Sequence, residues 1–309
     1  MNAKKTLVAP LHWGLGHATR SIPIIEAELA NGYEVLVAAT GGPRALLQKR
    51  FPEIEFVEIP FMEITYPKDE NMARHFAFNG FKLLWNIWKE HRFLQKLVEQ
   101  KKIDRVISDS RFGLFTKKVS CYFVSHQIEI QAPIFQGLIN WLNRWVMNQY
   151  NQVWIPDYET SPGLAGKLSH ANKMPKRYQY VGPLSRFSKA ETEKPEPVWD
   201  AVAIVSGPEP QRTLFEADLT RRFIESDEKA LLIQGKPHQP KEQKIDHLTI
   251  LNHLDDEALK AALLSAKTVI SRSGYSSIMD YEVLGIKAEF HPTPGQTEQE
   301  YLAELHQNK

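Results

Sequence analysis

The chain has 309 residues, 42% hydrophobic and 24% charged, a composition that can bury a full core and excludes disordered and fibrous proteins. Lys and Arg number 38 against 37 Asp and Glu, so the overall charge gives no reason to expect nucleic acid as a partner. The single cysteine, Cys121, excludes an intrachain disulfide framework, and with neither a signal peptide nor a spanning stretch expected, it predicts a cytoplasmic protein.

Short apolar runs alternate with longer stretches of helical periodicity, the pattern of parallel strands joined by helices. A stretch at 185–198, rich in proline and charge, is the predicted linker between domains at 1–184 and 199–309. The pattern predicts an α/β protein with two Rossmann-like domains. The expected strands are 6–9, 34–39, 55–59, 105–108, 121–125 and 152–155, then 201–206, 230–234, 248–251, 268–271 and 288–291.

The first chemical motif is Pro-Leu-His-Trp-Gly-Leu-Gly-His-Ala-Thr-Arg at 10–20, which follows the first expected strand and opens a helix. Gly14 and Gly16 allow a tight turn close to a ligand, and a helix N-terminus favours an anion. Thr19 replaces the third glycine of a dinucleotide fingerprint, which argues against an NAD site. His17 can act as a general base or hold a phosphate. The alternative is that the glycines only form the turn after the strand and contact no ligand.

Polar residues also follow later strands of this half. Asp109 is a candidate to orient His17 or an acceptor hydroxyl, with a turn-forming aspartate as the alternative. For His126, directly after the next expected strand, a core or surface histidine is expected. The segments 81–93 and 135–147 carry aromatic and basic residues at helical spacing. Such stripes usually belong to the core, but exposed stripes suit contact with a membrane surface and a lipid-linked acceptor.

In the second half, residues 269–285 predict a strand, a polar turn and a helix that ends at a glycine. The start of that helix can bind a diphosphate through hydroxyl and amide groups, with an arginine adding charge or orienting the loop. The candidates are Arg272, Ser273, Gly274, Tyr275 and Ser276.

Two further features belong to the same predicted donor site. Asp280 can accept both hydroxyls of a ribose, whereas a helix-capping serine and a solvated Asp280 are the alternative. A second glycine turn, with Gln296 and Gln299, follows the next strand. Turns at adjacent strand ends line one crevice at the carboxyl edge of a sheet.

These residues resemble glycosyltransferase family 28, which includes the peptidoglycan N-acetylglucosaminyltransferase that makes lipid II. The resemblance rests on residues 271–274, Asp280, Gln296 and Gln299, and more loosely on residues 14–17 with Arg20. It implies the GT-B fold, with two parallel-sheet domains facing a central cleft. It also implies that the N-terminal domain binds the acceptor and the C-terminal domain the donor, without a metal or another cofactor.

Two departures from the family stand out. A Gly-Gly-Ser type loop usually follows the first strand of the C-terminal domain, and here Ser-Gly-Pro-Glu-Pro-Gln-Arg occupies 206–212. Ser206, Gly207 and Arg212 remain candidate phosphate contacts, although two prolines remove amide donors and Glu209 adds negative charge. Family members also continue through further helices, so a shortened C-terminal domain is expected.

The resulting expectation is a glycosyltransferase that moves a hexose-type sugar from a nucleotide-sugar donor, UDP-linked as in the family, to an unknown acceptor. His17, helped by Asp109, would deprotonate the acceptor in an inverting displacement. The alternatives are a nucleotide-sugar hydrolase or epimerase and a non-catalytic sugar-nucleotide-binding protein. A lipid-linked acceptor would place the protein at the inner face of the membrane.

Overall fold

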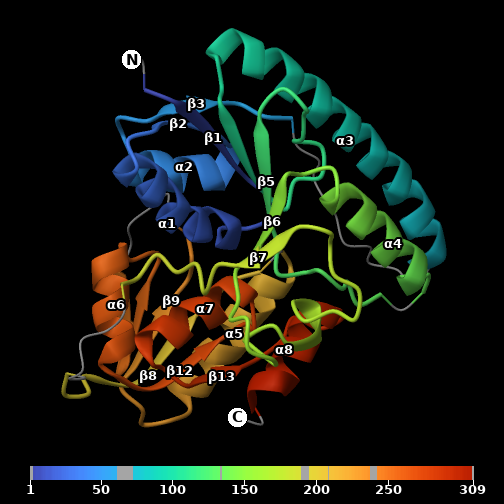
Figure 1. Ribbon diagram of the computed structural model, residues 1–309. Coiled ribbons are helices and arrows are strands. Elements are labelled where there is room, and N and C mark those ends of the chain that lie inside the picture. The colour runs from blue at the N-terminus through green and yellow to red at the C-terminus, as the bar shows by residue number, and fades with distance from the viewer. Residues whose placement is uncertain are drawn as a thin grey trace. The chain divides into compact units, whose positions relative to one another are not determined.

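The computed structural model describes residues 3–60, 72–132, 134–188, 195–207, 209–236 and 242–307, with side chains from residue 82 onward in the helix that begins at Met72. Pro208 of the expected phosphate loop and residues 189–194 of the expected linker lie outside the described residues. The chain divides into two compact units (Figure 1). Unit 1 comprises Met1–Glu159 and Lys167–Gly182, and unit 2 comprises Thr160–Gly166 and Pro183–Lys309.

Within the described residues, unit 1 contains a seven-stranded parallel sheet in the order β3-β2-β1-β4-β5-β6-β7. Its strands are β1 (Lys5–Pro10), β2 (Glu34–Ala38), β3 (Glu55–Val57), β4 (Arg105–Asp109), β5 (Ser120–Val124), β6 (Gln152–Ile155) and β7 (Tyr178–Tyr180). Its helices are α1 (Gly16–Ala30), α2 (Gly41–Arg50), α3 (Met72–Lys101) and α4 (Gln136–Met147).

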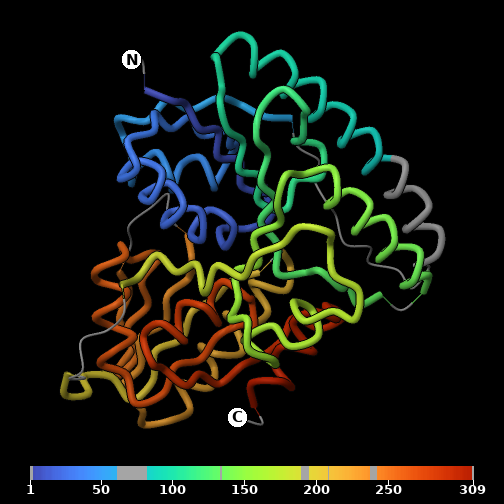
Figure 2. The backbone as a smooth tube through the Cα atoms, viewed as in Figure 1, coloured from blue at the N-terminus to red at the C-terminus, as the bar shows by residue number. Residues whose placement is uncertain are grey.

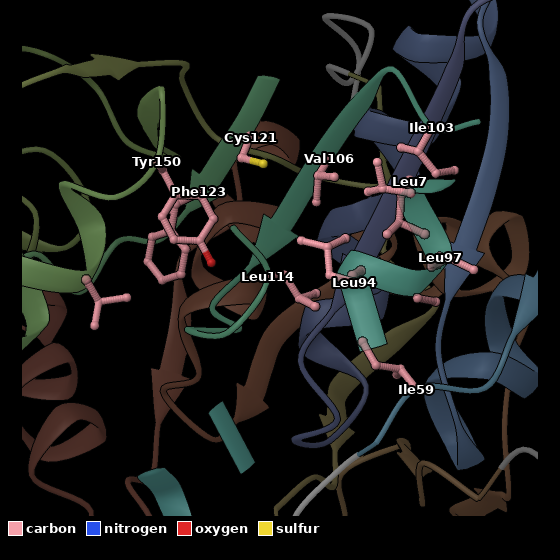
Figure 3. Close-up of a cluster of buried hydrophobic side chains, with 14 of the residues drawn as sticks. Leu7, Ile59, Leu94, Leu97, Ile103, Val106, Leu114, Cys121, Phe123 and Tyr150 are labelled. Carbon is pink, nitrogen blue, oxygen red and sulfur yellow. The ribbon is translucent and has the colours of Figure 1, made fainter. Parts of the chain in front are cut away.

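One face of this sheet carries a core cluster that α3 covers (Figure 3). Successive strand residues point to opposite faces, so alternate positions such as Leu7 of β1, Val106 of β4 and Phe123 of β5 share this face. Leu94 and Leu97 of α3 pack against them. Burying each such side chain contributes about 1.5–3 kcal/mol, which holds the sheet and its carboxyl edge in place.

A buried ion pair fixes the loop that follows β4. Arg111 Nη1 lies 2.6 Å from Glu90 Oε1 of α3, and the two side chains are 1% and 2% exposed. Arg111 Nε also donates to the carbonyl of Pro10, at the end of β1, at 2.8 Å. A Cβ on Gly113 would lie 2.4 Å from the carbonyl oxygen of Ile87, so this loop packs closely against α3. The ends of β1 and β4 are therefore tied to the helix.

Among the described residues, unit 2 contains a six-stranded sheet in the order β10-β11-β9-β8-β12-β13, in which only β10 is antiparallel to its neighbour. Figure 2 traces the backbone through its alternating strands and helices. The strands are β8 (Trp199–Ile204), β9 (Ala230–Ile233), β10 (Glu242–Ile245), β11 (Leu248–Leu251), β12 (Ala266–Ser271) and β13 (Ala288–Phe290). The helices are α5 (Gln211–Ile224), α6 (Asp256–Leu264), α7 (Tyr275–Leu284) and α8 (Thr297–Gln307).

The predicted fold class is confirmed, because both units are α/β structures built on parallel sheets, and every predicted strand is present. The strands β7 and β10 were not predicted, because both are short edge strands without an apolar run. Among the described residues, no helix has the length and apolarity required to cross a membrane.

The expectation that the aromatic stripes belong to the core is wrong for much of their length. On α3, Trp85 and Trp88 are 54% and 47% exposed, and on α4, Trp141 and Trp145 are 56% and 53% exposed. Phe81 lies outside the described side chains. Helical spacing alone gave the wrong answer because it marks an apolar face without saying whether that face points inward.

Candidate active site

The candidate residues of each unit lie at the carboxyl end of its sheet, where the strand order reverses. The reversal falls between β1 and β4 in unit 1, and between β8 and β12 in unit 2. Connections leave such a pair of strands in opposite directions and open a crevice in which α/β proteins bind ligands. His17 follows β1 and Asp109 ends β4, while the turns before α5 and α7 follow β8 and β12.

The glycine loop after β1 has the expected conformation. Gly14 has a φ of +68°, and no described atom lies within 4 Å of a Cβ added there. Gly16 is the first residue of α1, whose first turn contains no acidic side chain. The N-terminus of α1 therefore keeps its partial positive charge next to His17. Ligand contacts by Gly14 and Gly16 remain predictions.

The two predicted catalytic residues meet in unit 1. His17 Nδ1 lies 3.0 Å from Asp109 Oδ2. The Asp109 side chain is 1% exposed, whereas His17 is 17% exposed. In the tautomer with its proton on Nδ1, His17 donates to the carboxylate and keeps a lone pair on Nε2, the arrangement that a general base requires.

Arg20 completes this cluster. Its Nε donates to Asp109 Oδ2 at 2.8 Å, and its Nη2 donates to Oδ1. The same Nη2 lies 2.8 Å from His17 Nδ1, and Nη1 lies 3.3 Å from Nδ1 of His126. The sequence predicts no chemical role for Arg20 and favours a core or surface histidine at 126. The available signal for Arg20 was its position three residues after His17 on one helix face.

Burial and charge set the protonation states of the cluster. Burial lowers the pKa of His17 below its ordinary value and Arg20 lowers it further, although Asp109 opposes both. Burial alone would raise the pKa of Asp109, but the charges of Arg20 and His17 hold it well below its usual range. A neutral imidazole beside an ionised carboxylate is the expected state at neutral pH.

In unit 2, Arg272 organises the predicted donor loops. It is 5% exposed and stacks on Phe215, with 4.0 Å between the guanidinium carbon and the ring centroid. Its Nη1 donates to the carbonyls of His291 and Pro292 at 3.1 and 2.8 Å, and its Nη2 donates to the carbonyl of Gln211 at 3.2 Å. Of its two predicted roles, these contacts favour orienting the loops over contacting phosphate.

The start of α7 has space beside its N-cap residue. This residue is Gly274, which has no side chain to cap the helix, so the alternative of a serine as the N-cap residue is wrong. No described atom lies within 4 Å of a Cβ added to Gly274. Tyr275 is 3% exposed and Ser276 is half-buried. The N–H groups at a helix start are suited to bind an anion.

The second predicted turn packs directly against the first. Ser273 Oγ donates to the carbonyl of Gln299 at 2.7 Å, and the backbone N–H of Thr293 donates to Gln299 Oε1 at 2.8 Å. Gln296 is half-buried just before α8. Thr293 is 3% exposed, and among the described residues its hydroxyl has no hydrogen-bond partner. Thr293, which lies between two prolines, was not among the predicted site residues.

Asp280 is buried, so the alternative of a solvated carboxylate is wrong. Ser185 Oγ donates to its Oδ1 at 2.6 Å, and Arg186 Nε lies 3.3 Å from its Oδ2. Burial raises the pKa of Asp280 while Arg186 opposes that shift. Ribose binding by Asp280 remains a prediction. It requires a ribose hydroxyl to replace the hydroxyl of Ser185, or to share Oδ1 of Asp280 with it.

The loop after β8 offers less than expected. Gly207 has a φ of +117°, which only glycine adopts readily, and Ser206 beside it is exposed. Arg212 is held internally, with Nε 2.6 Å from Glu209 Oε1 and Nη1 2.7 Å from Glu216 Oε2. Phosphate binding by Arg212 remains a prediction that these two carboxylates oppose. Within the described ranges, no three His, Cys, Asp or Glu side chains gather as metal ligands.

Two proteins of Methanosarcina are similar to this chain in sequence. No family model matches it. It is 26% identical over 309 residues to an uncharacterized glycosyltransferase of Methanosarcina mazei, covering 93% of this chain and 79% of that protein. A second uncharacterized glycosyltransferase, from Methanosarcina acetivorans, is 27% identical over 166 residues, which is 47% of this chain and 40% of that one.

Solved structures similar to this chain share its architecture. The glycosyltransferase SnogD from Streptomyces nogalater matches with a TM-score of 0.65 at 15% identity, covering 98% of this chain and 86% of that one. MurG of Acinetobacter baumannii matches with a TM-score of 0.53 at 15% identity, covering 98% of this chain and 83% of that one. Phytolacca americana UGT2, complexed with UDP-2fluoro-glucose and pterostilbene, matches with a TM-score of 0.63 at 12% identity. The match covers 99% of this chain and 83% of that one. The chain therefore has the GT-B fold.

Proposed function

We propose that this protein is a glycosyltransferase, related to family 28, that moves a hexose-type sugar from a UDP-linked donor to an acceptor hydroxyl. The observation that carries the proposal is the His17–Asp109 pair at the carboxyl ends of β1 and β4, on a GT-B chain. The glycosyltransferase name of the Methanosarcina mazei relative and the UDP-sugar bound by Phytolacca americana UGT2 support the same reaction.

In this proposal the donor binds at the carboxyl edge of the sheet in unit 2. The start of α7 at Gly274 faces the diphosphate, with Thr293 and Gln296 on the next turn. Buried N–H dipoles that point at the leaving diphosphate stabilise its developing charge. A metal is not required for that task.

The acceptor hydroxyl is deprotonated by Nε2 of His17. Its oxygen attacks the anomeric carbon as the bond to the diphosphate breaks, and UDP leaves from the opposite side, so the anomeric configuration inverts. Asp109 holds the imidazole and stabilises the imidazolium that forms. General-base catalysis of this kind contributes about 10²–10⁴-fold to the rate.

The test is product analysis with a panel of nucleotide sugars and candidate hydroxyl acceptors, including lipid-linked ones. A glycoside with inverted configuration supports transfer, whereas free sugar alone would support the hydrolase. The His17→Ala variant should lose about 10²–10⁴-fold in kcat while it still binds UDP. Normal transfer by a folded His17→Ala variant would show that His17 is not the base.

The loop at Glu209 and Arg212 gives a specific reason to keep the non-catalytic alternative. An arginine already neutralised by two carboxylates is a weak phosphate ligand. If the protein binds a nucleotide sugar and no acceptor or water consumes it, the protein is a sugar-nucleotide-binding module and the transfer proposal is wrong.

A further inference from the structure

The helix α4 packs against unit 1 with polar residues on much of its inner face. Asn140 and Asn143 are each 5% exposed. Asn140 accepts a hydrogen bond from the N–H of Ile130 at 2.7 Å and donates to its carbonyl at 3.1 Å, while Asn143 donates to the carbonyl of Gln127 at 3.0 Å. Only at the end of the helix do apolar residues, Val146 and Met147, enter the core.

The apolar stripe of α4 faces outward instead. Leu138, Trp141 and Trp145 repeat at the spacing of one helix face and are 56%, 56% and 53% exposed. A surface helix of a globular protein normally turns such a stripe toward the core. The asparagines fix α4 in the opposite orientation, so the exposed stripe follows from specific contacts.

The helix α3 adds a second apolar row in the same unit. Leu84, Trp85 and Trp88 are 64%, 54% and 47% exposed, and the two indole rings stack with centroids 4.9 Å apart. Both helices pack onto the same core cluster, and Figure 1 shows them on the same side of the sheet. We call the six exposed side chains the aromatic surface: Leu84, Trp85, Trp88, Leu138, Trp141 and Trp145.

Cations lie among these rings. Lys89 Nζ lies 5.5 Å from the ring centroid of Trp85, and the guanidinium of Arg92 lies 5.0 Å from that of Trp88. Arg144 is the single charged residue of α4. Between Lys82 and Lys96 the one carboxylate is Glu90, which is buried against Arg111. The surface is therefore apolar and positive.

We propose that the aromatic surface binds the interface of an anionic lipid bilayer. Tryptophan is favoured at the level of the lipid headgroups, and Lys and Arg beside an apolar helix face attract anionic lipids. A second copy of the chain would bring like charges together, which disfavours self-association through this face. Bilayer binding does not depend on sugar transfer, so a negative result for one of the two proposals leaves the other unaffected.

The experiment measures binding of the full chain to vesicles of phosphatidylcholine, with and without phosphatidylglycerol, by flotation. Binding should be stronger to the anionic vesicles and weaken at high salt. Tryptophan emission should shift to shorter wavelength on binding, and brominated lipid should quench it. The affinity of the Trp141→Ser/Trp145→Ser variant for vesicles should fall by at least about tenfold, because the variant lacks two interfacial anchors.

Ile224→Ser is the matched control, since Ile224 is an apolar residue of unit 2 that is 48% exposed. It should bind vesicles like the native chain. Lys89→Glu/Arg92→Glu should lose the preference for anionic lipid. All variants should keep the native thermal unfolding temperature and UDP binding.

Three results would overturn the proposal. The first is no binding of the native chain to either vesicle, and the second is native binding by Trp141→Ser/Trp145→Ser. The third is a native dimer in sedimentation that this double variant converts to a monomer, without vesicle binding by either. That last result would identify a second copy as the occupant.

Discussion

Arg20 controls the proposed base through charge as well as geometry. It lies against both Asp109 and His17 and is one cause of the lowered pKa of His17. A positive neighbour disfavours the imidazolium, so removing it should raise that pKa. The pH profile of kcat/KM depends on the neutral imidazole, so its acidic limb should then lie at higher pH.

The Arg20→Gln variant tests this role by pH–rate profiles and by NMR titration of His17. Both the kinetic limb and the titration should move to higher pH than in the native protein. Arg44→Gln is the control, because Arg44 lies on α2 in a partly exposed pair with Glu58. A lower kcat with an unmoved limb would show that Arg20 acts only on the fold.

The site could be predicted from sequence where chemistry coincides with strand ends. His17 and Asp109 were expected to cooperate because both follow strands of one parallel sheet, and their 3.0 Å contact confirms that they meet. The partners of Asp280 could not be predicted, because Ser185 and Arg186 come from the expected linker, far away in sequence. Such contacts depend on the packing of the whole unit.

Among the elements, α3 is joined to the sheet by the Glu90–Arg111 pair. Removing one charge of a buried pair leaves the other without compensation, which costs about 3–5 kcal/mol. The Glu90→Gln variant should therefore lower the free energy of unfolding by that amount in urea denaturation. Glu99→Gln on the same helix should change it little, because its pair with Lys118 is exposed. Equal free energies of unfolding for Glu90→Gln and the native chain would show that the buried pair does not stabilise the fold.

The start of α7 is the element on which donor binding depends in the proposal. Asp and Asn are both good N-cap residues, so Gly274→Asp and Gly274→Asn should fold at least as well as the native chain. Only Asp places a negative charge where the diphosphate is proposed to bind. In thermal shift, UDP should stabilise Gly274→Asn much more than Gly274→Asp.

Similar UDP shifts for the two Gly274 variants, both as large as in the native chain, would place the diphosphate elsewhere. A loss of the shift in both would indicate that any side chain blocks the space. In that case, the charge at the helix start is not the deciding factor.

Element identity followed from the sequence more readily than element orientation. Continuous apolar runs mark β1, β4, β8 and β12, because strands buried on both faces have no polar alternation. The outward stripe of α4 did not follow, since it depends on hydrogen bonds between Asn140 or Asn143 and the backbone of the preceding loop. Amphipathic spacing shows that a helix has two faces, and tertiary contacts decide which one is buried.

At the scale of the whole molecule, the chain enters unit 2 for a short segment and returns to unit 1 before its final crossing. Residues Thr160–Gly166 belong to unit 2. His306 Nε2 of α8 lies 2.7 Å from the carbonyl of Leu164, and a Cβ on Gly166 would lie too close to Tyr301 for the packing to be kept. The sequence shows no boundary there, because so short a segment changes neither composition nor hydrophobic periodicity.

The division of tasks between the units leads to a prediction for hydrogen exchange. A ligand that binds only the native state slows exchange most at the amides that it contacts. Saturating UDP should protect the starts of α7 and α8 in unit 2 and leave the glycine loop around Gly14 unchanged. The His17→Ala variant should show the same pattern, because its imidazole acts on the acceptor. Protection confined to residues 12–20 would instead assign the nucleotide to unit 1, and His17 would then be a phosphate ligand rather than a base.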